Sequence, residues 1–198
     1  ALQLAVIRHQ HDTVALLLEQ SNMDRTLHNT QGNSAVHLAC NVGCQQALEM
    51  LIVLAGKERV DEPNVIHKLL RQQNEAGMAP LHIAAYNGHV DLVRIILSTC
   101  ATLSEKQELV NMRPRPGWTA LHVAVERGFL PVVTILLEEG FADPSAIRLQ
   151  DGSTSVHVSC TMNTTKHHAI LKALIQAIHV RLKSDQAATA GKTDVEVR

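Results

Sequence analysis

The chain has 198 residues, of which 45% are hydrophobic and 2% aromatic, and its formal net charge at pH 7 is −1. This balance argues against a nucleic-acid or anionic-membrane binder, which would carry a basic patch, and no apolar run approaches the roughly 20 residues that cross a bilayer. The four cysteines follow no recognisable pattern, which favours a reducing compartment, the cytoplasm or the nucleus.

A short motif recurs along the chain: a glycine, a small or hydroxyl-bearing residue two positions later, and a histidine five positions later. The copies are Gly32–Ala39, Gly77–Ala84, Gly117–Ala124 and Gly152–Ser159, and their glycines lie 45, 40 and 35 residues apart. The motif resembles the ankyrin repeat, whose Thr-Pro-Leu-His-x-Ala signature recurs about every 33 residues, so the first two copies carry insertions of about 12 and 7 residues. The resemblance implies an all-α solenoid of about five helix-turn-helix units with short hairpin loops.

Taken in chain order, the units are expected to form one domain over residues 1–183. Each unit reads as a loop, a short helix, a tight turn and a second helix. The expected units are about 1–28 (partial, without its hairpin), 29–73, 74–113, 114–148 and 149–183. Residues 184–198 are polar and lack periodicity, which predicts a disordered tail.

The first helices begin and end at recognisable residues. Ser34, Thr119 and Thr154 stand where a helix N-cap is expected, because their hydroxyls can accept from first-turn amides. Pro80 suits a first helical position, where its missing N–H is not needed. Gly88 lies between two helices and tolerates the positive φ of a tight turn.

The two insertions each predict a short extra helix. Residues 60–72 are expected to form one, capped by Asp61 or Glu62, with Pro63 in its first turn. Its apolar stripe is Val65, Ile66, Leu69 and Leu70. Ser104–Gln107 can form a capping box for one helical turn. Two interpretations stay open for both insertions, because they can extend a binding edge or pack on their own solenoid.

The N-terminal end of the chain is unusually apolar. Ala1 and Leu2–Ile7 are almost continuously apolar, whereas a terminal repeat needs a polar outer face. We therefore expect either a further repeat before Ala1 or a partner that covers this end.

The histidines invite a metal site, which the pattern disfavours. Four of them occupy the histidine position of the motif, once per repeat, and so cannot converge on one ion: His37, His82, His122 and His157. Cys40 and Cys44 follow His37 at helical spacing, but Gly43 is expected to end the helix before Cys44. A structural zinc site needs four clustered ligands, so we predict no metal and no cofactor.

Two further observations bear on chemistry. His167 and His168 are expected on the polar, solvated side of the last helix. No set of nucleophile, base and oxyanion donors is visible in the sequence, which predicts that the chain is not an enzyme.

Four segments are similar to the inhibitors of NF-κB, the I-kappa-B family. Gln31–Cys44 resembles the family's third repeat, which carries the same pair of cysteines around the turn, and His67–Arg71 resembles the end of its long third-repeat loop. Leu2–Ile7 and Arg115–Val125 match two other repeats. The similarity covers roughly residues 1–180. The family's N-terminal phosphodegron and acidic tail are missing from this sequence, as in a trimmed chain or a short, virus-encoded mimic.

The resemblance implies a function by binding. The stack would bind a Rel-homology dimer, with its first repeats on the nuclear-localisation segment and its later repeats on the dimerisation domains. The dimer would stay in the cytoplasm and away from DNA. The chain itself would be monomeric when free and would touch neither nucleic acid nor membrane. The expected partner-binding residues are Asn33, Met78, Trp118 and Ser153 at the hairpin tips, and Asn41, Tyr86, Asn87, Glu126 and Arg127 on the first helices.

Alternatives remain open at two levels. Trp118 and Tyr86 are the strongest candidates because Trp, Tyr and Arg dominate interface hot spots, yet each can instead pack on its own molecule. The chain can also be an ankyrin adaptor for another signalling protein, or the autoinhibitory ankyrin half of an NF-κB precursor. A fragment of an enzyme would need a catalytic domain outside this sequence.

Overall fold

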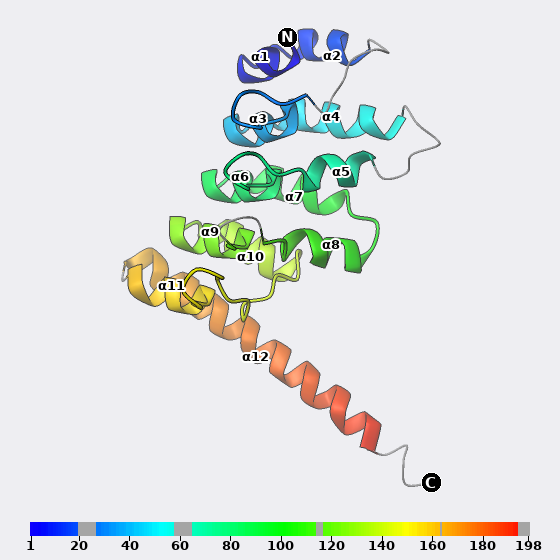
Figure 1. The fold of residues 1–198 in the computed structure, drawn as a ribbon. Helices are drawn as coiled ribbons and strands as arrows, with labels where there is room; N and C mark the ends of the chain where they lie inside the picture. Colours follow the sequence, from blue (N-terminus) through cyan, green and yellow to red (C-terminus); the bar gives the residue numbers. More distant parts are fainter. Residues whose placement is uncertain (20–26, 58–64, 114–116, 163, 194–198) are drawn as a thin grey trace.

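The computed structural model describes residues 1–19, 27–57, 65–113, 117–162 and 164–193, which form a stack of α-helices without a strand (Figure 1). The helices are α1 (Leu2–Ile7), α2 (His11–Leu18), α3 (Ala35–Val42), α4 (Gln45–Lys57), α5 (Val65–Arg71), α6 (Pro80–Asn87), α7 (Val90–Ser98), α8 (Leu103–Val110), α9 (Ala120–Arg127), α10 (Leu130–Glu138), α11 (Ser155–Met162) and α12 (Thr165–Thr193).

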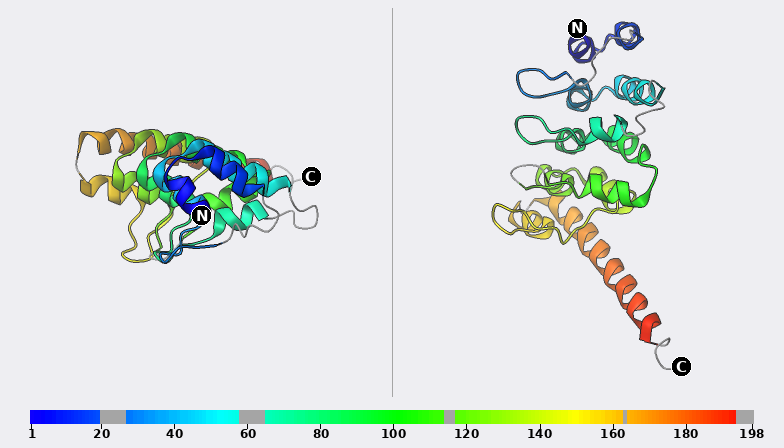
Figure 2. Two further views of the ribbon diagram at one scale, coloured as in Figure 1. Left: turned by 90° about the horizontal axis from the view of Figure 1, so that it is seen from above. Right: turned by 45° about the vertical axis from the view of Figure 1, so that its right-hand side comes forward.

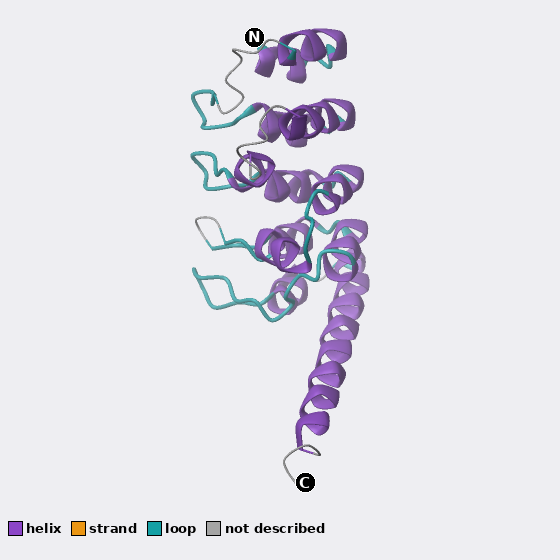
Figure 3. Ribbon diagram, turned by 90° about the vertical axis from the view of Figure 1, so that its right-hand side faces the viewer, coloured by secondary structure: helices purple, strands orange, loops and turns teal. Residues whose placement is uncertain are grey.

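The helices are arranged as repeating pairs. The first helices α1, α3, α6, α9 and α11 contact one another in sequence order, and so do the second helices α2, α4, α7, α10 and α12. Seen after a turn of 45° about the vertical axis, the pairs form successive layers (Figure 2, right). The loops that precede α3, α6, α9 and α11 project from the same side of the stack (Figure 3). The predicted all-α repeat solenoid is therefore confirmed.

The core is aliphatic and continuous between the layers. Leu48, Leu81, Leu121, Leu136 and Leu174 are all less than 2% exposed, and they come from four successive layers. Burying one such side chain contributes about 1.5–3 kcal/mol. Because one helix pair cannot cover its own apolar face, this stabilisation depends on the neighbouring pairs.

The predicted helix boundaries are confirmed. Ser34 and Thr119 are the N-caps of α3 and α9, and each forms a capping box with the histidine three residues later. Pro80 opens α6, where Ala79 leaves the N-cap without a side-chain hydrogen bond. Gly88 ends α6 with φ of 75°, a conformation that costs glycine little.

The helix predicted in the first insertion is present as α5. The predicted caps at residues 61–63 lie outside the described residues. Leu69 and Leu70 are 3% and 1% exposed and belong to the core, and α5 contacts α4 and α6. Leu69 and Leu70 therefore pack on their own solenoid, as the second of the two interpretations states.

The second insertion forms α8, but its predicted start is wrong. The N-cap is Thr102, whose hydroxyl accepts from the Glu105 amide at 3.2 Å, while Glu105 Oε2 accepts from the Thr102 amide at 3.3 Å. The box therefore begins two residues before Ser104. The helix runs beyond one turn because Leu109 and Val110 near its end are buried in the core.

We expect Thr102→Ala to lower the free energy of unfolding by about 1 kcal/mol, because the Glu105 amide loses the hydroxyl that accepts its hydrogen bond. Ser104→Ala is the matched control: Ser104 is exposed and lies inside the helix, so its removal should change stability by no more than about 0.5 kcal/mol. Equilibrium urea unfolding followed by circular dichroism measures both. Equal effects of the two substitutions would contradict the assignment of the cap.

The last helix is longer than the sequence predicts. α12 has 29 residues and continues to Thr193, so the expected disorder is wrong for residues 184–193, and 194–198 lie outside the described part. This stretch holds three alanines and no proline, which favours helix in spite of its polarity. Across the described residues, no helix combines the length and the apolar character that a membrane span requires.

Candidate protein-binding surface

Five of the predicted binding residues form a row at the carboxyl ends of α3, α6 and α9. Asn87 Nδ2 donates to Asn41 Oδ1 at 3.3 Å, from one repeat to the repeat before it. One layer further on, the guanidinium carbon of Arg127 lies 4.5 Å from the Tyr86 ring centroid. In both contacts, the residue directly before a turn glycine meets the residue that stands two positions before the turn glycine of the preceding repeat. Glu126 stands at the second of these positions in its own repeat and continues the row.

The row is open to a partner. Tyr86 is 44% exposed, and Asn41 and Arg127 are exposed as well, while Asn87 and Glu126 are half-buried. The contacts within the row hold its side chains in place before any partner binds. Pre-ordered side chains lose less conformational entropy on association, so the row is suited to binding.

The four predicted hairpin-tip residues are more enclosed than expected. Asn33, Met78, Trp118 and Ser153 are all half-buried. Asn33 Oδ1 accepts from Asn74 Nδ2 on the next hairpin at 2.8 Å, and Met78 packs against the core. The Ser153 amide donates to Asp151 Oδ1 at 3.0 Å. Some of the groups at the hairpin tips are therefore already in contact with the solenoid itself.

Trp118 packs on the neighbouring hairpin. The guanidinium carbon of Arg148, in the loop before α11, lies 4.1 Å from the Trp118 ring centroid. The indole Nε1 is buried and has no hydrogen-bond partner among the residues that the structure describes. This placement corresponds to the alternative in which Trp118 supports the stack, and it leaves Tyr86 as the more accessible aromatic side chain.

The Nε2 atoms of two motif histidines contact the backbone beside or within the start of the next repeat. Nε2 of His37 lies 3.1 Å from two carbonyl oxygens, that of Gln72 at the end of its own repeat and that of Met78 in the following repeat. Nε2 of His82 lies 3.2 Å from the Met112 carbonyl oxygen. These contacts fit a neutral ring that carries its proton on Nε2. Burial lowers the pKa of both histidines to about 4, so both rings are neutral at pH 7.

His157 departs from this pattern. It keeps the local contact, with Nδ1 2.8 Å from Thr154 Oγ1, but its side chain is exposed. Unlike His37 and His82, His157 is therefore not a buried imidazole. The physical reason is the position of its repeat, because no further hairpin lies over α11 among the described residues.

His167 is buried, and its predicted solvation is wrong. The residue is 6% exposed, Nε2 lies 2.8 Å from the Val125 carbonyl oxygen, and Nδ1 lies 2.7 Å from Thr164 Oγ1. His168 is exposed, as expected. The spacing of Thr164 and His167 is the same as in the Thr119 and His122 pair, and this signal could have revealed the role of His167.

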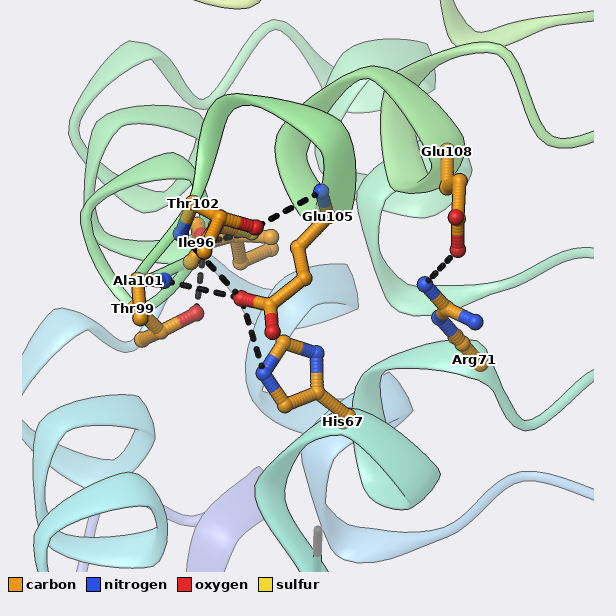
Figure 4. Close-up of polar contacts among 9 residues, drawn as sticks. His67, Arg71, Ile96, Thr99, Ala101, Thr102, Glu105 and Glu108 are labelled. Atoms are coloured by element: carbon orange, nitrogen blue, oxygen red, sulfur yellow. Dashed lines mark hydrogen bonds and ion pairs between the residues drawn. The ribbon is translucent and has the colours of Figure 1, made fainter.

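The two insertions meet at one edge of the stack (Figure 4). Glu105 Oε2 on α8 lies 3.4 Å from His67 Nε2 on α5, and Glu108 Oε2 lies 2.6 Å from a guanidinium nitrogen of Arg71. Sequence reasoning missed this pairing because nothing in either insertion indicates the other. Buried apolar residues near the ends of both helices pack inward. The Arg71 and Glu108 pair is exposed beside the repeats, while His67 and Glu105 are half-buried.

Comparisons with known proteins place the chain among repeat proteins. The family model for ankyrin repeats (3 copies) matches residues 52–148 and 102–185. The chain is 27% identical over 179 residues to the nuclear factor NF-kappa-B p105 subunit of Gallus gallus, covering 90% of this chain and 16% of that protein.

Two inhibitors are also similar. The chain is 32% identical over 106 residues to NF-kappa-B inhibitor alpha of Sus scrofa, covering 54% of this chain and 32% of the relative. It is 25% identical over 174 residues to NF-kappa-B inhibitor cactus of Drosophila melanogaster, covering 79% of this chain and 34% of the relative. The chain therefore spans only between 16% and 34% of the length of these three relatives.

Proposed function

The chain belongs to the ankyrin-repeat family, and on that basis we propose that it binds and sequesters NF-κB/Rel transcription factor dimers. Ankyrin repeats typically present a continuous surface to another protein and carry no catalytic chemistry of their own. Two of the relatives are named NF-kappa-B inhibitors and the third is an NF-kappa-B subunit, which supports this class of partner.

The observation that carries the proposal is the pre-ordered row on the first helices. It joins three adjacent repeats through side-chain contacts and exposes an aromatic ring beside a guanidinium group. In the proposed complex, residues 1–183 act as one binding unit, and the hairpin tips and the row face the dimer. The first repeats would cover the nuclear-localisation segment, so that the dimer stays in the cytoplasm and away from DNA.

Calorimetric titration of this chain with a Rel-homology dimer, with and without its nuclear-localisation tail, tests the proposal. Tight binding that weakens when the tail is removed supports sequestration by the first repeats. Binding that ignores the tail keeps the partner but moves the interface to the later repeats. If no Rel dimer binds, the inhibitor proposal fails and a general ankyrin adaptor remains.

In the same titration, we expect Tyr86→Ala to weaken binding by about 1–2 kcal/mol, roughly tenfold, because an exposed aromatic side chain at the centre of the row fits the hot-spot pattern. Ile175→Ala on α12 is the control: its side chain is 55% exposed but lies away from the row. Neither substitution should change the free energy of unfolding by more than about 0.5 kcal/mol. Unchanged affinity after Tyr86→Ala would remove the row from the interface.

A second candidate is the autoinhibitory ankyrin half of an NF-κB precursor. The match to the p105 subunit favours it, because that match covers 90% of this chain. The two candidates share the binding surface and differ in whether the Rel domain belongs to the same polypeptide. Sequencing of the full-length transcript separates them, since a precursor carries a Rel domain and a glycine-rich hinge before Ala1.

A further inference from the structure

The turn of the first repeat differs from the turns of the next three repeats, which end α3, α6 and α9. In α3 and α6 the turn residue is a glycine, at Gly43 and Gly88, and the side chain that follows the next repeat's turn glycine packs against it. A Cβ on Gly43 would lie 2.7 Å from the His89 ring, and one on Gly88 would lie 2.8 Å from the Phe129 ring. These turns leave no room for a side chain.

His9 occupies the corresponding turn position before α2. Its φ is 53°, the left-handed region that glycine adopts in the later turns. Cys44 follows Gly43 and thus corresponds to His89 and Phe129. In the first repeat the large and the small residue have therefore exchanged places. The ring of His9 stands at the turn, and the small thiol of Cys44 lies against it from the next repeat. A non-glycine residue held in this conformation often serves a function.

The reversal brings three potential metal ligands together. The ligand atoms of His9, His11 and Cys44 all lie within 4.8 Å of one another. Cys44 Sγ lies 3.9 Å from His11 Nδ1, and the rings of His9 and His11 meet edge to face with centroids 6.3 Å apart. Cys44 is 4% exposed, His11 is half-buried and His9 is exposed. A buried thiol thus lies at the floor of a site that opens to solvent through His9.

We propose that His9, His11 and Cys44 bind a zinc ion between the first and second repeats. Imidazole nitrogens bind zinc at about 2.0–2.1 Å and thiolate sulfur at about 2.3 Å, and a site with three protein ligands leaves the fourth tetrahedral position to water. On binding, the Cys44 thiol gives up its proton to solvent and its sulfur bonds to the ion. Small movements of the side chains close the present separations.

The proposed site differs from the cluster of His37, Cys40 and Cys44 that the sequence analysis weighed and rejected, and it departs from the prediction that no metal binds. His37 uses both ring nitrogens for Ser34 and the next repeat, so it is not available as a ligand beside Cys44. The new site instead joins two layers that are separate in sequence. An ion there would link the turn of the first repeat to the start of α4, and so hold α1 and α2 on the stack.

Titration of the metal-free, reduced 198-residue chain with Co²⁺ tests the site. We expect a near-ultraviolet thiolate-to-cobalt band and the visible bands of a tetrahedral complex, both reversed by Zn²⁺. Zinc should also slow amide hydrogen exchange in α1 and α2 and leave α9 unchanged. Absence of the thiolate band in the unaltered chain would overturn the proposal.

Two variants and one control identify the ligands. His9→Gly restores the residue that the later turns use, so the fold is retained while one ligand is lost. It should weaken zinc binding at least about tenfold, and Cys44→Ala should do the same and abolish the thiolate band. Cys160→Ser removes an exposed thiol and should change neither result. If His9→Gly binds zinc as tightly as the unaltered chain, or Cys160→Ser abolishes the band, the site is not the one proposed.

Discussion

Acidification from pH 7 to pH 4 is expected to destabilise the folded chain by several kcal/mol. Burial lowers the pKa of His37, His82 and His122 to about 4 in the folded state, whereas an unfolded histidine titrates near 6.5. Between these two values the unfolded chain binds more protons than the folded chain, so stability falls as the pH falls. The contribution is complete above pH 6.5 and is lost progressively down to pH 4.

The size of the expected loss in the free energy of unfolding follows from the difference between the folded and unfolded pKa of each histidine. One pKa unit corresponds to 1.36 kcal/mol, so each histidine contributes up to about 3 kcal/mol. Natural domains are stable by only about 5–15 kcal/mol, and three such groups can therefore unfold the stack. Urea unfolding at a series of pH values between 7 and 4 measures the loss.

The Asp151 carboxyl does not explain a loss above about pH 5. The backbone amide of Ser153 holds the pKa of Asp151 below its ordinary value, and an unfolded Asp titrates near 3.9, so the unfolded chain gains this proton only at the acid end of the window. A free energy of unfolding that stays constant from pH 6.5 to pH 4.5 would show that the three rings are not held neutral by burial.

The second large effect is expected for His37→Ala, which should lower the free energy of unfolding by about 3 kcal/mol. The substitution removes a fully buried ring and leaves a cavity between two repeats. It also removes the ring N–H from the carbonyl oxygens of Gln72 and Met78, which lie 3.1 Å from Nε2, and unpaired buried groups carry a further cost.

His157→Ala is the matched control. Both histidines contact a hydroxyl three residues earlier, since Ser34 Oγ and Thr154 Oγ1 lie 2.7 and 2.8 Å from the respective Nδ1 atoms. His157 is exposed and should cost about 1 kcal/mol or less. The difference between the two substitutions therefore isolates the contacts between repeats. Equal losses measured by urea unfolding would mean that the motif histidine acts only within its own repeat.

The sequence by itself determined the repeat architecture and its local details. The contacts of Ser34 with His37 and of Thr119 with His122 span three residues, and Pro80 and Gly88 act through their own backbone geometry. Such features depend on neighbours along the chain, so their spacing predicts them. The same holds for the row on the first helices, because a repeat places equivalent residues at equivalent positions.

Only the tertiary structure decided which of these side chains are covered. His37 and His157 share one local motif, yet His37 is 0% exposed and His157 is exposed, because within the described residues a following hairpin covers only the former. The pairing of α5 with α8 and the meeting of His9 with Cys44 depend on residues more than 30 positions apart. Local spacing carries no information on such contacts, since the stacking of whole repeats brings them together.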